Sequence, residues 1–379
     1  MALYVGCMSG TSLDGVDAVL AEFPVGEAPR VWAHAWEPYC QPLRDELLAL
    51  NADGPRELHR ASLAANAVAR AYADVVQRLL DHSGRVPLPV AIGAHGQTVR
   101  HRPQAFDGTG YTVQLLNGAL LAELTGLDVV CDFRSADVAA GGQGAPLVPA
   151  FHHASFADPR IPTAVLNIGG IANVTLLPGE AGPVLGYDCG PGNLLMDLWA
   201  ERHLGTRYDA DGEWARSGRL LPGLLAVMQS HPFFALLPPK STGRDDFHLD
   251  WLEGALARSG SASRAPFRAQ DVQATLAELT AWATAQSLRR DAPGTTRLLV
   301  CGGGARNGHL MTRLRAALPA IRVEPTDTLG VPADQVEALA FAWLAQACIE
   351  RRPGNLPAVT AATGPRILGA RYTGPGRAD

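Results

Sequence analysis

Near its start the chain has the stretch Leu3-Tyr4-Val5-Gly6-Cys7-Met8-Ser9-Gly10-Thr11-Ser12-Leu13-Asp14-Gly15-Val16-Asp17-Ala18-Val19-Leu20, in which two apolar segments flank a polar turn. This pattern predicts two strands joined by a tight turn. Glycines allow a turn to approach a ligand closely, and hydroxyl and free N–H groups can hold phosphate oxygens. Gly10 and Gly15 have the spacing of a P-loop, but Val16 stands where that motif needs Lys, which excludes a P-loop. A phosphate-binding turn and a purely structural hairpin turn both stay open.

The same pattern recurs in the middle of the chain. There Ala164–Ile168 leads into Gly169-Gly170, and Asn173–Leu177 follows. Each half also has an apolar segment that runs into a polar, glycine-rich loop, at Pro89–Thr98 and at Arg297–Ala305. Helical segments are expected at 58–82 and 272–290. Strands that alternate with helices predict an α/β fold, and two similar halves predict two similar domains that face a cleft.

We place the boundary between the predicted domains near Asp158–Pro162, where proline and polar residues interrupt the pattern. The expected domains are therefore residues 1–158 and 159–379. A helix that crosses between the halves is expected at Ala145–Phe156, and a further long helix at Asp334–Arg351, ended by Pro353-Gly354. Whether the end of the chain packs on the second domain or back on the first stays open.

Composition narrows the class of protein. Of 379 residues, 47% are hydrophobic and 18% are charged, which is typical of a globular chain long enough for two domains. The net charge of -5 and the lack of a dense Lys/Arg run argue against nucleic acid as a partner. The six cysteines are scattered without a CxxC pair, which argues against a zinc site or a disulfide framework and favours a cytoplasmic location. No signal peptide or long apolar segment is recognised, so a membrane is not an expected partner.

Further glycines are candidates for contact with a nucleotide. Gly169 and Gly170 form the turn of the second predicted hairpin, and paired turns from two domains would clamp phosphates between them. The run Gly302-Gly303-Gly304 follows a predicted strand, which suits close contact between the backbone and a nucleotide. A dinucleotide fingerprint would need glycine where Asn307 stands, so an NAD site is disfavoured. The structural alternative is a tight strand-to-helix turn.

Asp188 is the candidate for a catalytic carboxylate. It lies within Gly186–Asn193, beside glycines and a proline, before the predicted helical segment Leu194–Trp199. A carboxylate in a tight turn at the start of a helix is commonly an N-cap. It can also be a general base that faces a cleft, and the position of Asp188 between two phosphate-type loops favours that role.

Polar residues elsewhere are candidates for contact with a polyhydroxyl ligand. His95 and Gln97 follow a predicted strand, and Arg134 lies in the polar stretch Asp132–Asp137. They offer the mixed donors and acceptors that such a ligand needs. Glu337 lies in the predicted C-terminal helix. The alternatives are a structural role for His95 and a surface role for Glu337.

Taken together, these stretches resemble the anhydro-N-acetylmuramic acid kinases. The resemblance rests on motifs that follow one another along the chain: Met8–Asp17, Gly96–Thr98, Asn167–Asn173, Gly190–Asn193, Pro238–Arg244, Asp271–Thr275 and Cys301–Asn307. Ordered motifs over the whole chain make a specific signal, whereas each motif alone is weak.

The resemblance implies a fold and a reaction. The fold would be the α/β, two-domain actin-like ATPase (ribonuclease H-like) fold, with ATP in a central interdomain cleft. The reaction would open 1,6-anhydro-N-acetylmuramic acid with water and phosphorylate O6, giving N-acetylmuramic acid 6-phosphate and ADP in cell-wall peptidoglycan recycling. Asp188 would be the general base that activates water to attack C1, while O6 attacks the γ-phosphate in line, with Mg²⁺ on the phosphates.

The resemblance also implies binding residues. The ATP phosphates would be lined by Gly10, Thr11, Ser12, Leu13, Asp14, Gly15, Val16 and Asp17, joined by Gly169 and Gly170, with Gly302, Gly303 and Gly304 near the nucleoside. The sugar would be contacted by His95, Gln97, Arg134 and Glu337. Metal ligands are not assigned. The expected partners are a small-molecule sugar and ATP, and a homodimer is left open.

Other functions stay open from the residues alone. A glycoside hydrolase would need two carboxylates that flank the bond, and the sequence identifies no second carboxylate beside Asp188. An actin-like ATPase that senses or assembles would need self-association surfaces. A kinase for a different sugar would share the fold.

Overall fold

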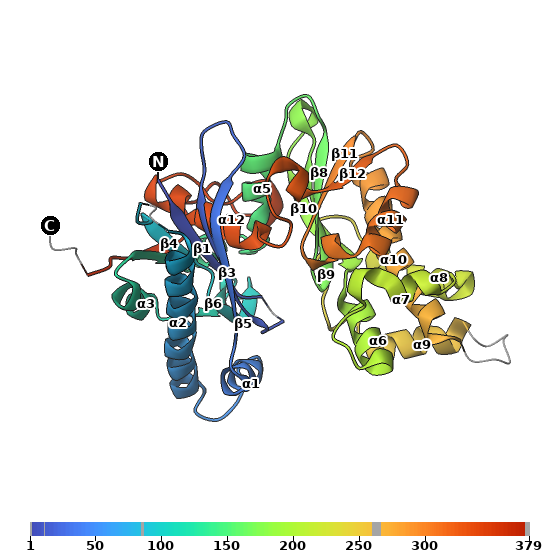
Figure 1. Cartoon of the computed structure of the whole chain (residues 1–379), viewed down its shortest axis with the longest axis horizontal. Coiled ribbons are helices and arrows are strands. Elements are labelled where there is room, and N and C mark those ends of the chain that lie inside the picture. Colours follow the sequence, from blue (N-terminus) through green and yellow to red (C-terminus); the bar gives the residue numbers. More distant parts are fainter. Residues whose placement is uncertain (1, 11, 85–86, 260–266, 376–379) are drawn as a thin grey trace. The chain divides into compact units, whose positions relative to one another are not determined.

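The computed structural model describes residues 2–10, 12–84, 87–259 and 267–375. The chain divides into two compact units, and Figure 1 labels most of their helices and strands. The first unit comprises Met1–Ser155, Leu329–Val331 and Gln335–Asp379, and the second comprises Phe156–Thr328 and Pro332–Asp334.

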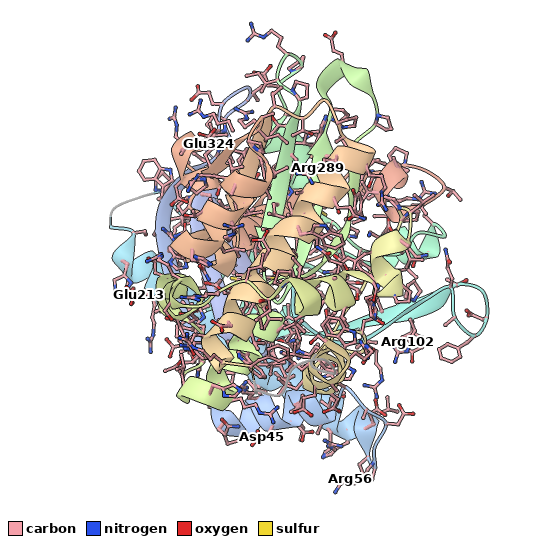
Figure 2. All side chains as sticks on the ribbon, turned by 90° about the vertical axis from the view of Figure 1, so that its right-hand side faces the viewer. Asp45, Arg56, Arg102, Glu213, Arg289 and Glu324 are labelled. Atoms are coloured by element: carbon pink, nitrogen blue, oxygen red, sulfur yellow. The ribbon has the colours of Figure 1, made fainter. Side chains whose placement is uncertain are left out.

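The sheet of the first unit has the strand order β13-β7-β4-β1-β2-β3. Its strands are β1 (Tyr4–Met8), β2 (Gly15–Glu22), β3 (Arg30–Pro38), β4 (Ala91–Ala94), β7 (Asp128–Cys131) and β13 (Ala370–Tyr372). Strand β1 pairs antiparallel with β2 and parallel with β4, which confirms the predicted first hairpin and the strand before His95. A separate ribbon is formed by β5 (Gln97–Pro103) and β6 (Gly110–Leu115), and Arg102 marks it in Figure 2.

Helices α2 (Glu57–His82) and α12 (Val336–Ile349) cover opposite faces of this sheet, and further helices complete the first unit. These further helices are α1 (Gln41–Ala49), α3 (Gly118–Thr125), α4 (Ser135–Ala139), α5 (Val148–Phe156) and α13 (Pro357–Thr360). On one face, Tyr72 and Val76 of α2 join a buried apolar cluster with Val5 and Cys7 of β1. The neighbouring residue Gly6 faces the opposite side, where α12 packs, because successive residues of a strand point to opposite faces.

Helix α12 packs directly against the backbone of the sheet. A Cβ atom on Gly6 would lie 1.9 Å from the carbonyl oxygen of Ala338, and one on Gly93 would lie 2.0 Å from that of Phe341. The helix is apolar around most of its surface, as expected for a helix buried on all sides. These contacts join residues 335–379 to the first unit, whereas the sequence-based division placed them in 159–379.

The second unit contains a sheet with the strand order β10-β9-β8-β11-β12. Its strands are β8 (Thr163–Ile168), β9 (Ile171–Leu177), β10 (Leu185–Pro191), β11 (Arg297–Cys301) and β12 (Arg322–Pro325). Strand β8 pairs antiparallel with β9 and parallel with β11, which confirms the second predicted hairpin. The order β10-β9-β8-β11-β12 repeats the order β3-β2-β1-β4-β7 of the first unit, so the predicted internal repeat is confirmed at the level of topology.

The second unit is completed by helices on its sheet. They are α6 (Leu194–Leu204), α7 (Glu213–Ser217), α8 (Pro222–Gln229), α9 (Leu249–Ser259), α10 (Ala269–Asp291), which Arg289 marks in Figure 2, and α11 (Gly308–Ala317). The long α10 is buried along most of its length, in a cluster with residues of β8, β9 and β11. The predicted helices at 58–82 and 272–290 are confirmed as α2 and α10, and the α/β class is confirmed in both units. Among the described residues, none of the helices has the length and apolar character that a membrane crossing requires.

Candidate functional site

In the first unit, the turn after β1 and the loop after β4 lie at the same edge of the sheet. They meet there because β1 and β4 are parallel neighbours, and ligands of α/β proteins bind at the carboxyl ends of such strands. The turn closes with a hydrogen bond from the Leu13 N–H to the Gly10 carbonyl at 3.2 Å. A Cβ atom on Gly10 would meet nothing closer than the Ser12 hydroxyl at 3.7 Å, so the backbone at Gly10 is accessible to a ligand. Thr11 lies outside the described residues.

Of the other residues predicted to line the ATP phosphates, some are accessible and some are buried. Ser12 and Asp14 are exposed, and Asp17 is partly exposed, with a carboxylate oxygen 3.3 Å from Nε2 of His34. Leu13 and Val16 are buried in the core, so only their backbone groups can contact a ligand. Gly15 has a packing reason to be glycine, because its Cβ atom would lie 2.2 Å from the carbonyl oxygen of Glu37.

His95 is held as a neutral imidazole. The Arg134 guanidinium donates to Nε2 of His95 from Nη2 at 2.8 Å and lies 3.3 Å away at Nε, and it also donates to the Gly144 carbonyl at 2.8 Å. Burial and the Arg134 charge lower the pKa of His95 to about 3. Since Nε2 accepts from Arg134, the ring proton is on Nδ1, which has no hydrogen-bond partner at normal distance among the described residues.

Gln97 and Glu337 complete the polar group of the first unit. The Gln97 amide donates to the Gly10 carbonyl at 3.1 Å, and its oxygen is buried without a partner among the described residues. Glu337 is exposed in the first turn of α12. Partial desolvation by surrounding protein atoms and the nearby Asp17 carboxylate raise the pKa of Glu337, whereas Arg134 lowers it. The structure thus brings Asp17, Arg134 and Glu337 within electrostatic reach of one another.

In the second unit, Asp188 lies inside strand β10, so the prediction that it stands in a tight turn at a helix start is wrong. The pairing with β9 shifts register between Asp188 and Gly190, which is a β-bulge, and bulges re-aim side chains beside functional sites. The glycines and the proline of this strand led to the prediction of a turn, because these residue types by themselves favour turns. Helix α6 begins at Leu194, as predicted, so the strand ends before the helix starts.

One oxygen of the Asp188 carboxylate is held by the loop that follows the short 3₁₀ helix Pro232–Ala235. Oδ2 accepts from the Ser241 hydroxyl at 2.9 Å and from the Thr242 N–H at 3.0 Å, and the Asp188 N–H donates to the Lys240 carbonyl at 3.2 Å. Burial raises the pKa of Asp188, while the two donors and the Lys240 charge lower it. The arrangement fixes the carboxylate through Oδ2 and leaves Oδ1 without a hydrogen-bond donor among the described residues.

The glycine-rich loops of the second unit differ in how open they are. The carbonyl groups of Gly169 and Gly170 accept backbone hydrogen bonds from the start of α6. The Asn193 N–H donates to the Gly169 carbonyl at 2.8 Å. Cβ atoms on Gly302 and Gly304 would collide with β8 at 2.3 Å, so these two residues have a packing reason to be glycine. A Cβ atom on Gly303 would meet nothing closer than 3.7 Å, so it is the accessible member of the run.

Comparison with known proteins identifies the family. The family model described as anhydro-N-acetylmuramic acid kinase matches residues 2–374. The chain belongs to the anhydro-N-acetylmuramic acid kinase family. The anhydro-N-acetylmuramic acid kinase of Cupriavidus pinatubonensis is 56% identical over 370 residues, which cover 97% of this chain and 98% of that protein. The one of Bordetella parapertussis is 57% identical over 373 residues, covering 98% and 96%.

The fold of this family member is of the α/β, actin-like ATPase class, as expected from the resemblance. A solved structure that aligns with it is the activator of the 2-hydroxyisocaproyl-CoA dehydratase from Clostridium difficile with bound ADPNP. It is 13% identical, with a TM-score of 0.46, over 92% of this chain and 97% of its own. Values this low do not define the fold by themselves, and the shared strand order of the two units carries the assignment.

Sequence reasoning missed residues that support the candidate site. Ser241 and Thr242 hold Asp188 although they lie more than fifty positions away in the chain. The signal was present, because the Pro238–Arg244 motif is part of the resemblance to the anhydro-N-acetylmuramic acid kinases, but a motif alone does not say which side chain it contacts. Tyr72, a buried residue in the middle of α2, was missed because its contact with Ser9 has no local signature.

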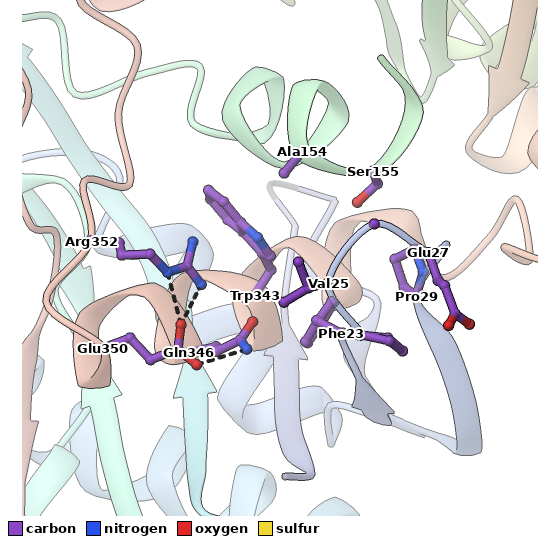
Figure 3. Close-up of a pocket in the computed structure, with 12 residues that line it drawn as sticks. Phe23, Val25, Glu27, Pro29, Ala154, Ser155, Trp343, Gln346, Glu350 and Arg352 are labelled. Atoms are coloured by element: carbon purple, nitrogen blue, oxygen red, sulfur yellow. Dashed lines mark hydrogen bonds and ion pairs between the residues drawn. The ribbon is translucent and has the colours of Figure 1, made fainter. Parts of the chain in front are cut away.

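A hollow of about 360 Å³ lies elsewhere in the first unit (Figure 3). It is lined by the β2–β3 connection, the end of α5 and the C-terminal part of α12, with Trp343 and Phe23 among its walls. Arg352 pairs there with Glu350 at 2.8 Å. The predicted site residues do not line this hollow, so it is separate from the candidate site.

Proposed function

We propose that this chain uses ATP to convert 1,6-anhydro-N-acetylmuramic acid, with water, into N-acetylmuramic acid 6-phosphate and ADP. Membership of the anhydro-N-acetylmuramic acid kinase family over nearly the whole chain supports the reaction. The observation that carries the chemistry is the Asp188 carboxylate, which is partly buried at a β-bulge and anchored through a single oxygen.

Asp188 is proposed as the general base. Burial raises its pKa towards the working pH, which makes a carboxylate a better proton acceptor. With Oδ2 held by Ser241 and Thr242, Oδ1 takes a proton from water as the water oxygen bonds to C1. The C1–O6 bond breaks, O6 forms a bond to the γ-phosphorus, and ADP leaves. Such a step depends on positioning more than on covalent chemistry by the protein.

The nucleotide phosphates are proposed to bind the turn after β1. Its backbone N–H groups at Gly10, Ser12 and Asp14 are accessible, and backbone N–H groups of a turn form an anion-binding concavity. Gly169 and Gly170 are proposed as the second phosphate contact, and Gly303 as the residue that lets the backbone approach the nucleoside.

Mg²⁺ is proposed to arrive with the phosphates. Among the described residues there is no group of three or more His, Cys, Asp or Glu side chains that would hold a metal by themselves, and Mg²⁺ commonly uses one or two carboxylates plus substrate phosphates. The partly exposed carboxylate of Asp17, at the end of the turn proposed to bind phosphate, fits that role. When bound, the ion would neutralise charge on the transferred phosphoryl group.

The sugar is proposed to contact His95, Gln97, Arg134 and Glu337. His95 would donate from Nδ1–H, and the Gln97 oxygen would accept from a hydroxyl or amide N–H. Arg134 orients His95, and Glu337 adds an acceptor in the first turn of α12.

The test is to follow ADP and the sugar product together. Purified protein with Mg·ATP and 1,6-anhydro-N-acetylmuramic acid should release ADP only when the sugar is present, and phosphorus NMR should identify a 6-phosphate. Opening of the sugar without ATP would establish a hydrolase instead. ADP release with another sugar alone would establish a kinase of different specificity, and ADP release without any sugar would establish an actin-like ATPase.

The proposal predicts a cytoplasmic location and leaves a homodimer open. Fractionation of cells that express the chain tests the location, and sedimentation of the purified protein tests the homodimer.

A further inference from the structure

The turn after β1 and the loop after β4 hold each other by reciprocal side-chain hydrogen bonds. The Ser9 hydroxyl, on the first segment, donates to the carbonyl of Gly96 on the second at 3.1 Å. The Gln97 amide, on the second, donates to the carbonyl of Gly10 on the first at 3.1 Å. A backbone hydrogen bond from the His95 N–H to the Cys7 carbonyl at 3.0 Å joins them as well. Each segment therefore fixes a main-chain group of the other.

Tyr72 anchors this junction from helix α2. Its hydroxyl lies 2.8 Å from the Ser9 oxygen, and both residues are buried. A serine hydroxyl has a single proton, which here goes to the Gly96 carbonyl, so Tyr72 must be the donor to Ser9. The chain of donors Tyr72 to Ser9 to Gly96 runs in one direction, and hydrogen bonds in such a chain polarise and strengthen one another.

The side-chain oxygen of Gln97 indicates which ligand this residue contacts. Gln97 is fully buried, and with its amide nitrogen on the Gly10 carbonyl its oxygen has no partner among the described residues. A buried acceptor without a partner is destabilising, so a ligand that supplies a donor is favoured there. Phosphate oxygens are acceptors, whereas a sugar hydroxyl or an N-acetyl N–H is a donor. Gln97 thus touches the phosphate turn through its nitrogen and offers its oxygen to the sugar.

We propose that Ser9, Tyr72 and Gln97 form a latch that couples the binding of nucleotide and sugar. This inference rests on the proposed function and adds its regulation. A phosphate on the turn after β1 orders the Gly10 carbonyl, which holds the Gln97 oxygen ready for the sugar. A sugar donor on that oxygen polarises the amide and strengthens its bond to Gly10 in return. Tyr72 acts as a positioning residue, because it reaches the ligands only through Ser9.

The test variant is the double substitution Ser9→Ala with Tyr72→Phe. It removes both hydroxyls of the buried Ser9–Tyr72 hydrogen bond together, so neither hydroxyl is left without the other, and only the Gly96 carbonyl loses a donor. The matched control is Thr284→Val in α10 of the second unit, which loses a buried hydroxyl that donates to the Thr280 carbonyl at 3.0 Å. Any effect common to losing a buried hydroxyl appears in both proteins.

The first readout needs only Mg·AMPPNP, a non-hydrolysable ATP analogue, and amide hydrogen exchange. We expect the analogue to slow exchange in residues 94–98 of the wild type and of Thr284→Val, and not in the double variant. The second readout is the Kd of 1,6-anhydro-N-acetylmuramic acid with and without saturating AMPPNP. The nucleotide should tighten sugar binding at least about fivefold in the wild type, within the usual range of coupling between sites, and the double variant should lose most of that factor.

The outcomes separate the latch from the proposed function. Equal protection of residues 94–98 in the wild type and the double variant, or protection limited to the turn after β1, would overturn the latch and leave the kinase assignment standing. Protection that depends on Ser9 and Tyr72 in a protein that does not phosphorylate the sugar would support the latch and overturn the substrate. A wild type that does not bind AMPPNP would overturn both.

Discussion

Replacing Gly6 with alanine should destabilise the first unit strongly. Gly6 lies in β1 where α12 crosses it, and a Cβ atom there would sit 1.9 Å from the Ala338 carbonyl oxygen and 2.6 Å from the Ala342 nitrogen. These atoms belong to the backbone of a buried helix and cannot rotate away. Strand or helix would have to shift by about 1.5 Å, the difference between 1.9 Å and an ordinary contact of 3.4 Å.

The size of the effect follows from the packing of this interface. Overpacking a well-packed core costs typically about 1–3 kcal/mol, and a clash with backbone atoms belongs at the upper end of that range. Since 1 kcal/mol lowers Tm by about 2–4 °C in domains of 150–250 residues, a cost of about 3 kcal/mol corresponds to a fall of about 6–12 °C. Strand β1 also carries the turn proposed to bind phosphate, so AMPPNP should stabilise Gly6→Ala less than it stabilises the wild type.

Differential scanning calorimetry of Gly6→Ala measures this, with Gly223→Ala as the control. Gly223 lies in α8, where a Cβ atom would meet nothing within 4 Å, so alanine there should be neutral or stabilise by up to about 1 kcal/mol. If Gly6→Ala melted within about 2 °C of the wild type, the direct packing of α12 on β1, and with it the assignment of residues 335–379 to the first unit, would be refuted.

Three further substitutions or titrations probe the polar sites. The Ser241 hydroxyl lowers the pKa of Asp188, so in Ser241→Ala this pKa rises further and less of the base is deprotonated at a given pH. The acid limb of the kcat/KM profile of Ser241→Ala should therefore move to higher pH. An unmoved limb would show that the hydroxyl does not act on Asp188. His95 should stay neutral from about pH 5 to pH 8, because burial and the Arg134 charge lower its pKa to about 3, and NMR of its ring should show no titration in that window. Arg134→Met should raise this pKa but leave it below the ordinary histidine value, because burial is the larger cause; a wild-type titration near the ordinary value would contradict the burial of the ring. Asp137 is buried and accepts hydrogen bonds from the side chains of Asn355 and Thr360 in the C-terminal segment. Asp137→Ala should therefore lower the free energy of unfolding in urea by about 3 kcal/mol. A loss below about 1 kcal/mol would refute the anchoring role of Asp137.

The hairpins and long helices were predictable because their signals are local. The polar turn between two apolar segments at Gly10 specifies β1 and β2, and the Gly169-Gly170 turn specifies β8 and β9 in the same way. Helix α2 was predicted to within a residue at its start, since its apolar periodicity lies within one segment. These elements depend on neighbours in the chain.

The third strand of each unit was not predicted. Strand β10 carries glycines and a proline, which are turn signals unless a neighbouring strand satisfies the backbone, and β9 does so here. The return of α12 to the first unit has no local signature either, because it depends on Gly6 and Gly93 leaving room for a helix more than two hundred residues away. Topology and domain membership therefore followed from long-range packing.

In the candidate site, too, the residue types were predictable from the sequence and their long-range contacts were not. Asp188 was identified through the resemblance, but its setting was not, because the donors Ser241 and Thr242 come from a distant loop. Gln97 was selected for its chemistry, and its bond to the Gly10 carbonyl follows only from the parallel pairing of β1 with β4. Residue types were predictable, and the contacts that tune them were not.

The measurement that tests the proposed function most directly is sugar-dependent ADP release by Asp188→Asn beside Asp245→Asn. Asp245 is an exposed carboxylate in the same loop that holds Asp188, so its loss changes the charge without touching the base. With Mg·ATP and 1,6-anhydro-N-acetylmuramic acid, we expect the wild type and Asp245→Asn to release ADP at similar rates and Asp188→Asn to be slower by about 10²–10⁴-fold, the usual contribution of a general base. Sugar-dependent ADP release by Asp188→Asn at the wild-type rate would contradict the assignment of Asp188 as the base, and no sugar-dependent release by the wild type would contradict the proposed reaction itself.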